Sequence, residues 1–246
     1  MLREKFIYYP RELFNQFILE GFNLYISRDE IGKEVFHGTT TVGARCSDGI
    51  VLATDTRVVA GYTFIAHKRG KKVHKIDDHL AVTISGGVAD AQALVDLLRV
   101  QSRLYRLSRK VPMPVKSAAS IASLVMFRNR FYRLLVQLII GGVDAYGPSI
   151  YQVEPFGGVV EERYVATGSG SPTAVGYLEA SIRDELTIEE AIPILIEAIN
   201  VATQRNTATG NDIEIAIVDS KGYRELTEKE KEEYLQRLSP RFQRSI

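Results

Sequence analysis

The chain has 246 residues, of which 45% are apolar, enough to bury a sizeable core in one or two domains. Its 31 basic and 30 acidic residues give a formal net charge of +1, which argues against a protein that binds nucleic acid or an anionic membrane. The single cysteine, Cys46, excludes an internal disulfide framework and a cysteine-rich metal site. No stretch approaches the roughly 18 continuous apolar residues that span a membrane, so we expect a soluble, cytoplasmic protein.

The first 38 residues differ in character from the rest of the chain. They hold five basic and six acidic residues, whereas a transit peptide is rich in arginine and poor in acids. Leu13, Phe14, Phe17 and Ile18 would share one face of a helix. The segment is then either a docked amphipathic arm or a removable prosegment, and the residues that follow decide between the two.

From residue 39 the sequence predicts strands, two helices, strands, two helices and a strand. The β-branched run 39–45 and the buried run 50–54 flank the turn Ser47-Asp48-Gly49 and predict a hairpin. We also expect 63–66 to pair with 72–76 across a turn that contains Gly70. The remaining expected strands are 80–85, 135–141, 149–154, 159–166 and 213–218.

Helical spacing of apolar residues and two capping boxes predict the helices. They are expected over 89–109 and 115–130, after Pro172, from Thr187 to about Arg205, and from Thr227 onward. Pro193 lies inside the fourth of these, where we expect a kink or a later start. Blocks of antiparallel strands alternating with paired helices predict an α+β fold, in which two sheets stack face to face between helix pairs. Residues 39–246 contain no linker-like stretch, so we expect one domain.

Several common catalytic signatures are missing. There is no G-x-x-x-x-G-K-[ST] phosphate loop, no H-E-x-x-H zinc motif and no G-x-S-x-G elbow, and we expect neither a metal nor a cofactor. The run Gly168-Ser169-Gly170-Ser171 fits either a plain turn or a nest of backbone donors. A glycine before a strand that begins with threonine, as at Gly38-Thr39, is unremarkable by itself, because a threonine hydroxyl is a poor nucleophile without a base beside it.

Six short blocks in one order are more specific than any one of them. The blocks run from Gly38 to Gly43, Ala53 to Arg57, Gly70 to Val73, Ile84 to Gln92, Gly141 to Asp144, and Ala166 to Pro172. Together they resemble the β-type proteasome subunits, members of the N-terminal-nucleophile hydrolases, and most closely the archaeal ones. The resemblance spans essentially residues 38–220.

This resemblance implies a four-layer αββα sandwich, the arrangement that the order of strands and helices also predicts. It implies self-cleavage of the Gly38–Thr39 bond, with 1–38 as a removable prosegment and 39–246 as the catalytic domain. Thr39 would carry the nucleophilic hydroxyl, and its freed α-amine, with a pKa of about 7.7–8.0, would be the general base. Before cleavage that nitrogen is an amide and cannot accept a proton, so the prosegment would keep the site inactive.

The resemblance also implies supporting roles. Lys72 matches the family lysine beside the nucleophile, with Lys71 as a minor rival because the preceding segment is one residue longer than the family pattern. Asp55 matches the carboxylate paired with that lysine. The backbone N–H of Gly86 matches the oxyanion-hole donor, where a glycine lets a substrate carbonyl approach closely. Ser169 matches the serine that hydrogen-bonds near the threonine amine.

Two positions depart from the family pattern, which usually reads Arg-Asp-x-x-Ser-Gly after the long helix. Here the stretch is Arg205-Asn206-Thr207-Ala208-Thr209-Gly210. Thr209 keeps a hydroxyl, whereas Asn206 keeps an acceptor oxygen but loses the charge. The substitution at Asn206 therefore puts full activity in doubt.

Four apolar positions match the family's pocket for the residue before the cut. They are Val58, Gly70, Ile84 and Val88. If they line a pocket, cleavage after large hydrophobic residues is favoured over cleavage after acidic ones. The alternative is that these side chains only pack in the core.

The leading hypothesis is a threonine endopeptidase subunit that degrades unfolded proteins to peptides. The resemblance implies homo- or heteroheptameric β rings, stacked with α-type rings in a core of twenty-eight subunits and fed by an ATP-dependent unfoldase. A structural β-type subunit with little activity is the second hypothesis, and Asn206 supports it. A different N-terminal-nucleophile amidase is the third, and the blocks around Thr39 and Ser169 oppose it.

Overall fold

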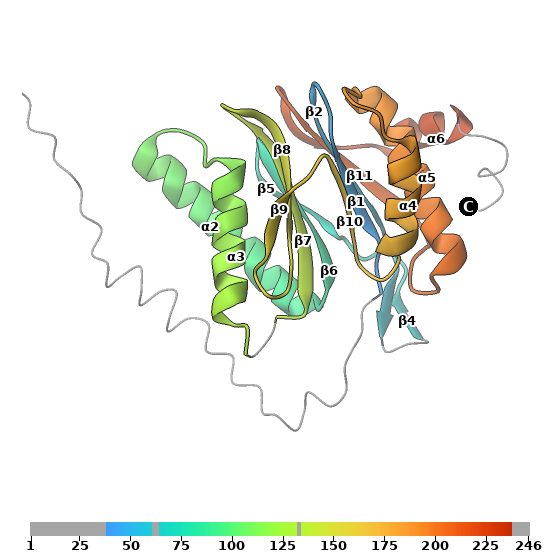
Figure 1. The fold of residues 1–246 in the computed structure, drawn as a ribbon, viewed down its shortest axis with the longest axis horizontal. Helices are drawn as coiled ribbons and strands as arrows, with labels where there is room; N and C mark the ends of the chain where they lie inside the picture. The colour runs from blue at the N-terminus through green and yellow to red at the C-terminus, as the bar shows by residue number, and fades with distance from the viewer. Residues whose placement is uncertain (1–37, 61–63, 132–133, 238–246) are drawn as a thin grey trace, which may run out of the picture. The chain divides into compact units, whose positions relative to one another are not determined.

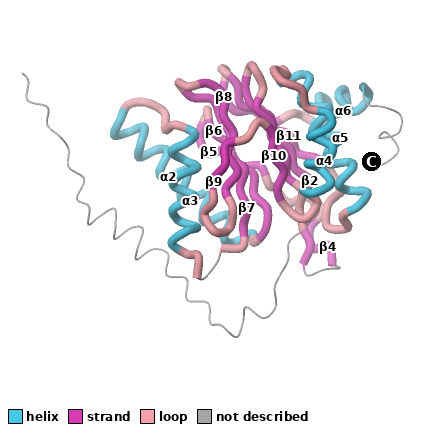
Figure 2. Tube along the Cα trace, viewed as in Figure 1, coloured by secondary structure: helices cyan, strands magenta, loops and turns pink. Residues whose placement is uncertain are grey.

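The computed structural model describes residues 38–60, 64–131 and 134–237 (Figure 1). The expected helical face in the N-terminal segment lies outside these residues. The described chain forms four layers, in which one pair of helices, two β-sheets and a second pair of helices follow one another (Figures 1 and 2). This confirms the α+β sandwich that the sequence predicts. None of the described helices is long and apolar enough to cross a bilayer.

The first sheet has five strands in the order β10-β1-β2-β11-β12. Every residue of β2 is buried, because this strand lies in the middle of the sheet and both of its faces are covered. The predicted hairpin between the first two strands is confirmed, with Thr41 opposite Thr54. The strands are β1 (Thr41–Arg45), β2 (Gly49–Asp55), β10 (Tyr164–Thr167), β11 (Ile213–Asp219) and β12 (Gly222–Glu225).

The second sheet is antiparallel as well, with the order β5-β6-β7-β8-β9. Its central strand pairs place apolar side chains against both the other sheet and a helix pair. A separate two-stranded ribbon joins β3 (Val58–Ala60) to β4 (Phe64–His67). The strands of the second sheet are β5 (Val73–Asp77), β6 (Leu80–Gly86), β7 (Val136–Asp144), β8 (Gly147–Val153) and β9 (Val159–Glu161).

Three apolar layers hold the sandwich together. Helices α2 (Val88–Arg109) and α3 (Val115–Arg128) cover the second sheet. Helices α4 (Ser171–Ser181) and α5 (Ile188–Arg205) cover the first. Between the sheets, side chains such as Ile50, Leu52, Ile139 and Ile150 form a third, fully buried layer. The outer helix pairs therefore leave the ends of the two sheets as the places where polar groups can gather.

The expected pairing of 63–66 with 72–76 is wrong. Strand β4 pairs with β3, and β5 pairs with β6 in the second sheet. The connecting segment is anchored instead to the end of β2, where the N–H of Gly70 donates to the carbonyl of Thr56 at 2.8 Å. Strands β4 and β5, which follow one another in sequence, thus belong to different sheets. Strand β5 carries the buried residues Val73 and Ile76, whereas β4 is largely exposed.

The expected single strand over 159–166 is also wrong, because the chain crosses between the two sheets within it. Glu162 still donates its N–H to Ile150 in the second sheet, at 3.1 Å, whereas the carbonyl of Arg163 accepts from Arg45 in the first, at 2.7 Å. The result is an exposed edge strand, β9, and a largely buried strand, β10, in different sheets.

The helices follow the sequence more closely. The capping box at Thr187 and Glu190 is present, and α5 begins at Ile188, directly after Thr187, so the later start considered because of Pro193 is wrong. The C-terminal helix α6 (Glu228–Arg237) begins at the second predicted capping box, where Thr227 and Glu230 exchange hydrogen bonds. Strand β12, between β11 and α6, has no counterpart among the predicted elements.

Candidate active site

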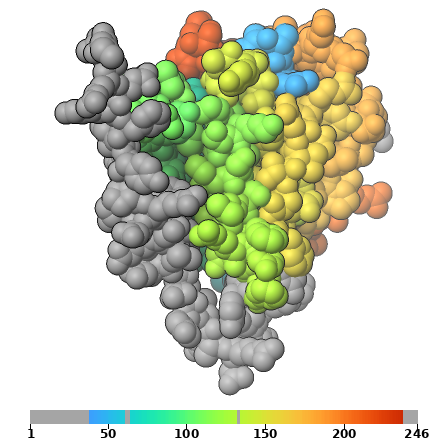
Figure 3. Space-filling model, turned by 60° about the vertical axis from the view of Figure 1, so that its left-hand side comes forward, coloured from blue at the N-terminus to red at the C-terminus, as the bar shows by residue number. Residues whose placement is uncertain are grey.

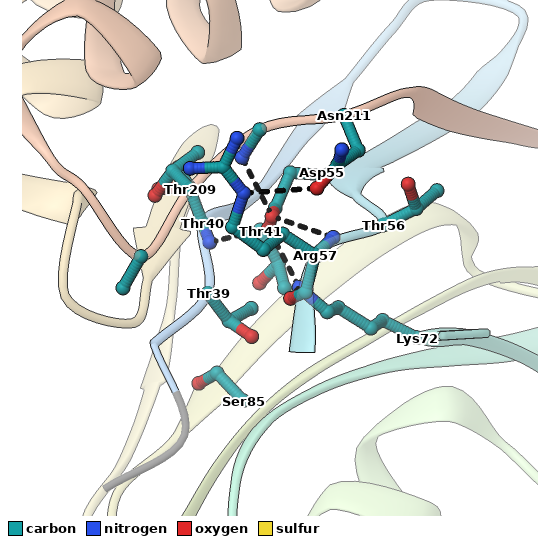
Figure 4. Close-up of polar contacts among 12 residues, drawn as sticks. Thr39, Thr40, Thr41, Asp55, Thr56, Arg57, Lys72, Ser85, Thr209 and Asn211 are labelled. Atoms are coloured by element: carbon teal, nitrogen blue, oxygen red, sulfur yellow. Dashed lines mark hydrogen bonds and ion pairs between the residues drawn. The ribbon is translucent and has the colours of Figure 1, made fainter. Parts of the chain in front are cut away.

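Thr39 lies at the entrance to β1, at one end of the first sheet (Figure 4). Only 3% of the residue is exposed. Its backbone N–H donates to Oγ of Ser169 at 3.3 Å, and its carbonyl accepts from the N–H of Gly170 at 3.4 Å. Two segments that are 130 residues apart in sequence are therefore joined at this threonine.

A buried ion pair lies next to it. Nζ of Lys72, directly before β5, is 2.8 Å from Oδ1 of Asp55, the last residue of β2. Oδ1 also accepts from the N–H of Thr40 at 2.8 Å, and Oδ2 accepts from the N–H of Gly210 at 3.0 Å. Lys72 donates further to the carbonyl of Arg57 at 2.6 Å. The carboxylate thus ties the start of β1 to the lysine and to the loop after α5.

Burial dominates the electrostatics of this pair. It raises the pKa of Asp55 and lowers the pKa of Lys72, in each case because the charged form loses contact with water. The ion pair opposes both shifts, and the backbone hydrogen bonds from Thr40 and Gly210 also oppose the shift of Asp55. The buried carboxylate of Asp55 thus stabilises the charged form of Lys72, which burial alone would disfavour.

The two adjacent lysines face opposite ways. Lys72 is 5% exposed and points to Asp55. Lys71 is exposed and forms an ion pair with Glu225 at 2.6 Å. The geometry therefore places Lys72, and not Lys71, beside Thr39 (Figure 4).

Gly86 ends β6, on the sheet opposite to Thr39. Its φ of +106° is one that residues with a Cβ rarely adopt, and a Cβ at this position would overlap the carbonyl oxygen of Leu135. The backbone shape at the end of β6 thus requires glycine. An N–H held in such a rigid turn is a suitable donor for a developing oxyanion.

The loop after α5 contacts the Ser169 side chain through Asn206. Oδ1 of Asn206 accepts from Oγ of Ser169 at 3.2 Å, from the N–H of Ala208 at 2.9 Å, and from Oγ1 of Thr209 at 3.2 Å. Oγ1 of Thr209 is also 2.7 Å from Oγ1 of Thr40. One amide oxygen therefore accepts three hydrogen bonds. Two of the donors, Ser169 and Thr209, also contact Thr39 and Thr40 respectively.

The four expected pocket residues divide between two environments. Val58 and Gly70 pack against each other beside the end of β2. Ile84 belongs to the core beneath α2, whereas Val88, in the first turn of that helix, is 37% exposed. The structure thus brings two of the four into contact, and the pocket stays a prediction.

Sequence reasoning gave no part to Asn211 or to four buried hydroxyl groups at this end of the sandwich. Nε of Arg57 donates to Oδ1 of Asn211 at 2.9 Å, which braces the loop after α5. Four hydroxyl side chains form a separate buried cluster; they are those of Thr41, Thr83, Ser85 and Thr167. Serine and threonine residues in otherwise apolar strands are the sequence feature that could have predicted this cluster.

Comparison with known proteins decides the family. The proteasome subunit family model matches residues 35–218. The chain is 46% identical over 203 residues to proteasome subunit beta 2 of Nitrosopumilus maritimus, which covers 82% of this chain and 96% of that protein. It is 48% identical over 188 residues to proteasome subunit beta 1 of Pyrobaculum calidifontis. This match covers 76% of this chain and 93% of that protein.

The chain belongs to the proteasome subunit family. Proteasome subunit beta of Methanothermobacter thermautotrophicus, 43% identical over 208 residues, covers 84% of this chain and 99% of that protein. The chain is accordingly a β-type subunit of the proteasome core particle and a protease of that family, with a part in protein degradation. The hypothesis of a different N-terminal-nucleophile amidase is therefore wrong.

Proposed function

We propose that the chain is the precursor of a threonine-type endopeptidase whose nucleophile is Thr39. The observation that carries this proposal is the position of Thr39, whose backbone nitrogen is 3.3 Å from Oγ of Ser169 while the neighbouring Thr40 donates to Asp55, the partner of Lys72. A hydroxyl, a nitrogen that becomes an amine on cleavage, and a buried lysine thus meet at one strand end. A nucleophile with an adjacent base is the arrangement that nucleophilic catalysis requires.

In this proposal, cleavage of the Gly38–Thr39 bond creates the base. The freed α-amine, with a pKa of about 7.7–8.0, takes the proton of the Thr39 hydroxyl as its oxygen attacks the substrate carbonyl. The N–H of Gly86 stabilises the oxyanion that forms, and the peptide nitrogen leaves with a proton returned by the amine. The resulting ester on Thr39 is hydrolysed by water, which regenerates the hydroxyl.

The positive charge of Lys72 has a defined part in this scheme. A nearby cation stabilises the neutral form of an amine and the anionic form of a hydroxyl, so it lowers the pKa of both groups on Thr39. Asp55 holds the lysine in place through the 2.8 Å ion pair. Ser169 and Asn206 then orient the amine through the hydrogen bonds that link them.

The proposal includes the division of the chain into a removable prosegment, 1–38, and a catalytic domain, 39–246. Gly38 is buried, and a Cβ at this position would overlap the side chain of Ala208. The chain therefore enters the site in a space that admits only a glycine before Thr39. Ala208 in turn donates its N–H to Asn206, so the bond to be cut packs against the loop that orients Ser169.

The mass of the intact subunit tests this proposal. The full-length chain is produced with its assembly partners, and the subunit from purified particles is weighed. We expect loss of the first 38 residues, leaving Thr39 as the N-terminus. Particles that hydrolyse peptides while every β-type subunit keeps its prosegment would contradict the proposal.

A second candidate function is a ring subunit with little activity, and Asn206 favours it. The family's aspartate would present a charged acceptor to Ser169, whereas the amide presents a neutral oxygen and an NH₂ donor. Unprocessed, inactive particles would support this second candidate. The intact Thr39, Asp55, Lys72 and Gly86 favour the enzyme.

The finer details of assembly and substrate belong to the same proposal. We expect heptameric β rings stacked with α-type rings, an ATP-dependent unfoldase, unfolded polypeptide substrates cut after large hydrophobic residues, and work in the cytoplasm. Figure 3 shows a face on which the green segment that includes α3 lies at the surface. Phe127 on α3 is 50% exposed and packs against Gly157, whose neighbour in sequence, Phe156, is 58% exposed. Large apolar side chains exposed on the surface favour contact with another subunit.

A further inference from the structure

Four buried hydroxyl groups form a continuous hydrogen-bonded chain between the two sheets. Oγ1 of Thr83 donates to Oγ1 of Thr41 at 3.0 Å, and Oγ1 of Thr41 lies 2.8 Å from Oγ1 of Thr167. Oγ1 of Thr167 in turn lies 3.0 Å from Oγ of Ser85. All four residues are between 0% and 4% exposed, so water does not compete for these contacts.

The direction of the hydrogen bonds follows from the two ends. Thr83 donates to Thr41 at one end, and Ser85 donates to the carbonyl of Gln137 at the other, at 3.3 Å. A hydroxyl has one proton to donate. The chain uses every proton only if Thr41 donates to Thr167 and Thr167 donates to Ser85, which makes it a single directed sequence.

Two of these hydrogen bonds cross from one sheet to the other. Thr41 and Thr167 face each other on β1 and β10 of the first sheet, whereas Thr83 and Ser85 lie two residues apart on β6 of the second. The cluster adjoins the apolar layer between the sheets, to which Leu52, Ile139 and Ile150 belong. Apolar contacts are non-directional, whereas hydrogen bonds fix distance and angle, so this cluster can set the spacing of the sheets at its own end.

Three members of the cluster adjoin the residues to which the proposed function assigns the chemistry. Thr41 follows Thr39 by two residues, and Thr167 precedes Ser169 by two. Ser85 directly precedes Gly86. The close-up shows Ser85 beneath Thr39, at the point where β6 approaches the start of β1 (Figure 4).

We propose that this hydroxyl chain positions the reacting groups, because it holds the sheet that carries Thr39 and Ser169 at a fixed distance from the sheet that carries Gly86. The inference rests on the proposed function, in which the nucleophile and the oxyanion donor come from different sheets. Reacting atoms must be held within about 3–3.5 Å, and an error of about 1 Å can cost 100-fold in rate. Thr41 and Thr167 both join the two sheets, and Thr167 is the central positioning residue because it does so at Ser85, the residue next to Gly86.

The test replaces Thr167 by valine, which keeps the shape of the side chain and removes its hydroxyl. In processed particles we expect Thr167→Val to lower kcat for a fluorogenic peptide by about 10- to 100-fold and to change KM by less than about twofold. Thr167→Ser restores the hydroxyl and should restore most of the turnover. If Thr167→Val particles do not assemble, Ser85→Ala interrupts the same chain and carries the same expectation.

Thr54 supplies a matched control. It lies opposite Thr41 in the same sheet and is fully buried, but its hydroxyl finds no hydrogen-bond partner among the described residues. Thr54→Val should therefore leave kcat and KM unchanged. An equal loss of turnover in Thr54→Val and Thr167→Val would overturn the inference, and so would full turnover in Thr167→Val.

The outcome separates this inference from the proposed function. If Thr39→Ala particles still hydrolyse the peptide, the proposed nucleophile is wrong whatever the hydroxyl variants do. If Thr39→Ala is inactive and Thr167→Val keeps the parent turnover, the proposed function stands and the positioning role is wrong.

Discussion

Lys71 and Lys72 are adjacent residues of the same type, but one forms an exposed ion pair and the other a buried one. Lys72 is buried in an ion pair with a carboxylate that accepts three further backbone hydrogen bonds. Lys71 makes an ion pair in which both side chains are about half exposed. Exposed ion pairs contribute about 0–1 kcal/mol, whereas breaking a buried pair leaves an uncompensated charge.

We expect Lys72→Ala to lower peptide hydrolysis by at least about 100-fold and Lys71→Ala to change it by less than about twofold. Removal of Lys72 also removes the cation that lowers the pKa of the groups on Thr39. The measurement is steady-state turnover by assembled particles, with their melting temperature as a check on folding. Equal losses in the two variants would show that Lys72 has no special role.

Asn206 and Thr209 are the two positions at which the sequence departs from the expected family pattern, and only Asn206 loses a charge. We expect Asn206→Asp to raise turnover, because a carboxylate would strengthen the bonds from Ser169, Ala208 and Thr209 that now end on one amide oxygen. One stronger bond at an ordered site is worth roughly 1–3 kcal/mol, or about 5- to 150-fold in rate. Steady-state hydrolysis by fully processed parent and variant particles measures the effect.

Asn211→Asp is the control for charge alone. Asn211 lies in the same loop as Asn206, is exposed and accepts from Arg57, so the substitution adds the same charge away from Ser169. We expect it to change turnover by less than about threefold. Equal gains from both substitutions would assign the effect to charge and not to the acceptor at Asn206.

At the scale of elements, the sequence predicts the helices and strands whose signals lie within their own residues. Helix α2 follows from apolar residues at helical spacing, and α5 and α6 follow from their capping boxes. The split of 159–166 could not be predicted, because it depends on which sheet accepts each backbone group. Glu162 and Arg163 are adjacent and polar, and nothing in their types says that one bonds to β8 and the other to β1.

In the candidate site too, the sequence predicts residue types but not contacts between distant segments. The blocks around Thr39, Asp55 and Lys72 identify residues whose chemistry suits the reaction, and the structure brings these three together (Figure 4). The sequence does not distinguish Thr54 from Thr167, although one hydroxyl is unpartnered among the described residues and the other joins two sheets. Such roles depend on contacts between distant segments, which periodicity does not encode.

Asp77 shows how one side chain fastens a helix to a sheet. At the end of β5 it accepts from Oγ of Ser102 at 2.8 Å and from Nη2 of Arg106 at 2.7 Å, both on α2. Burial alone would raise the pKa of Asp77, but hydrogen bonds from Ser102 and from the N–H of Asp78, with the Arg106 charge, hold it below its ordinary value. The ionised form is therefore the one that the folded state prefers.

We expect Asp77→Asn to lower the free energy of unfolding at pH 7 by about 1–2 kcal/mol, a value reduced by solvent screening around Arg106. A carboxyl with a depressed pKa stabilises the fold above its unfolded pKa of about 3.9, and this contribution is lost as the pH falls through the folded value. Thermal unfolding of parent and variant from pH 7 to pH 3 should show a converging difference.

Asp96→Asn is the matched control for Asp77→Asn. Asp96 lies on α2 as well, but its side chain is 73% exposed in an ion pair with Arg99. We expect a change below about 0.5 kcal/mol at every pH. A difference for Asp77→Asn that did not shrink on acidification would mean that the carboxyl acts through its shape and not through its charge.

At the scale of the whole molecule, the candidate site lies where the two sheets come together. The first sheet carries Thr39 and Asp55 at the ends of its strands, and the second carries Gly86 and begins directly after Lys72. Helix pairs cover the outer faces and leave this end to the loops. The sandwich is thus a rigid frame in which the proposed catalytic groups come from strand ends, which hold their positions better than loops do.

The whole molecule should therefore tolerate the loss of its nucleophile. We expect Thr39→Ala to fold and assemble as the parent does, because Thr39 precedes β1 and its side chain belongs to none of the three apolar layers. The same variant should retain residues 1–38 and hydrolyse no peptide, since one hydroxyl serves both reactions in our proposal. Particle size, intact mass and peptide turnover, measured on one preparation, separate these effects. Processing in Thr39→Ala particles that contain no other active β-type subunit would show that another group cuts the Gly38–Thr39 bond. Hydrolysis at the parent rate would show that Thr39 is not the nucleophile, and failure to assemble would show that it has a structural role.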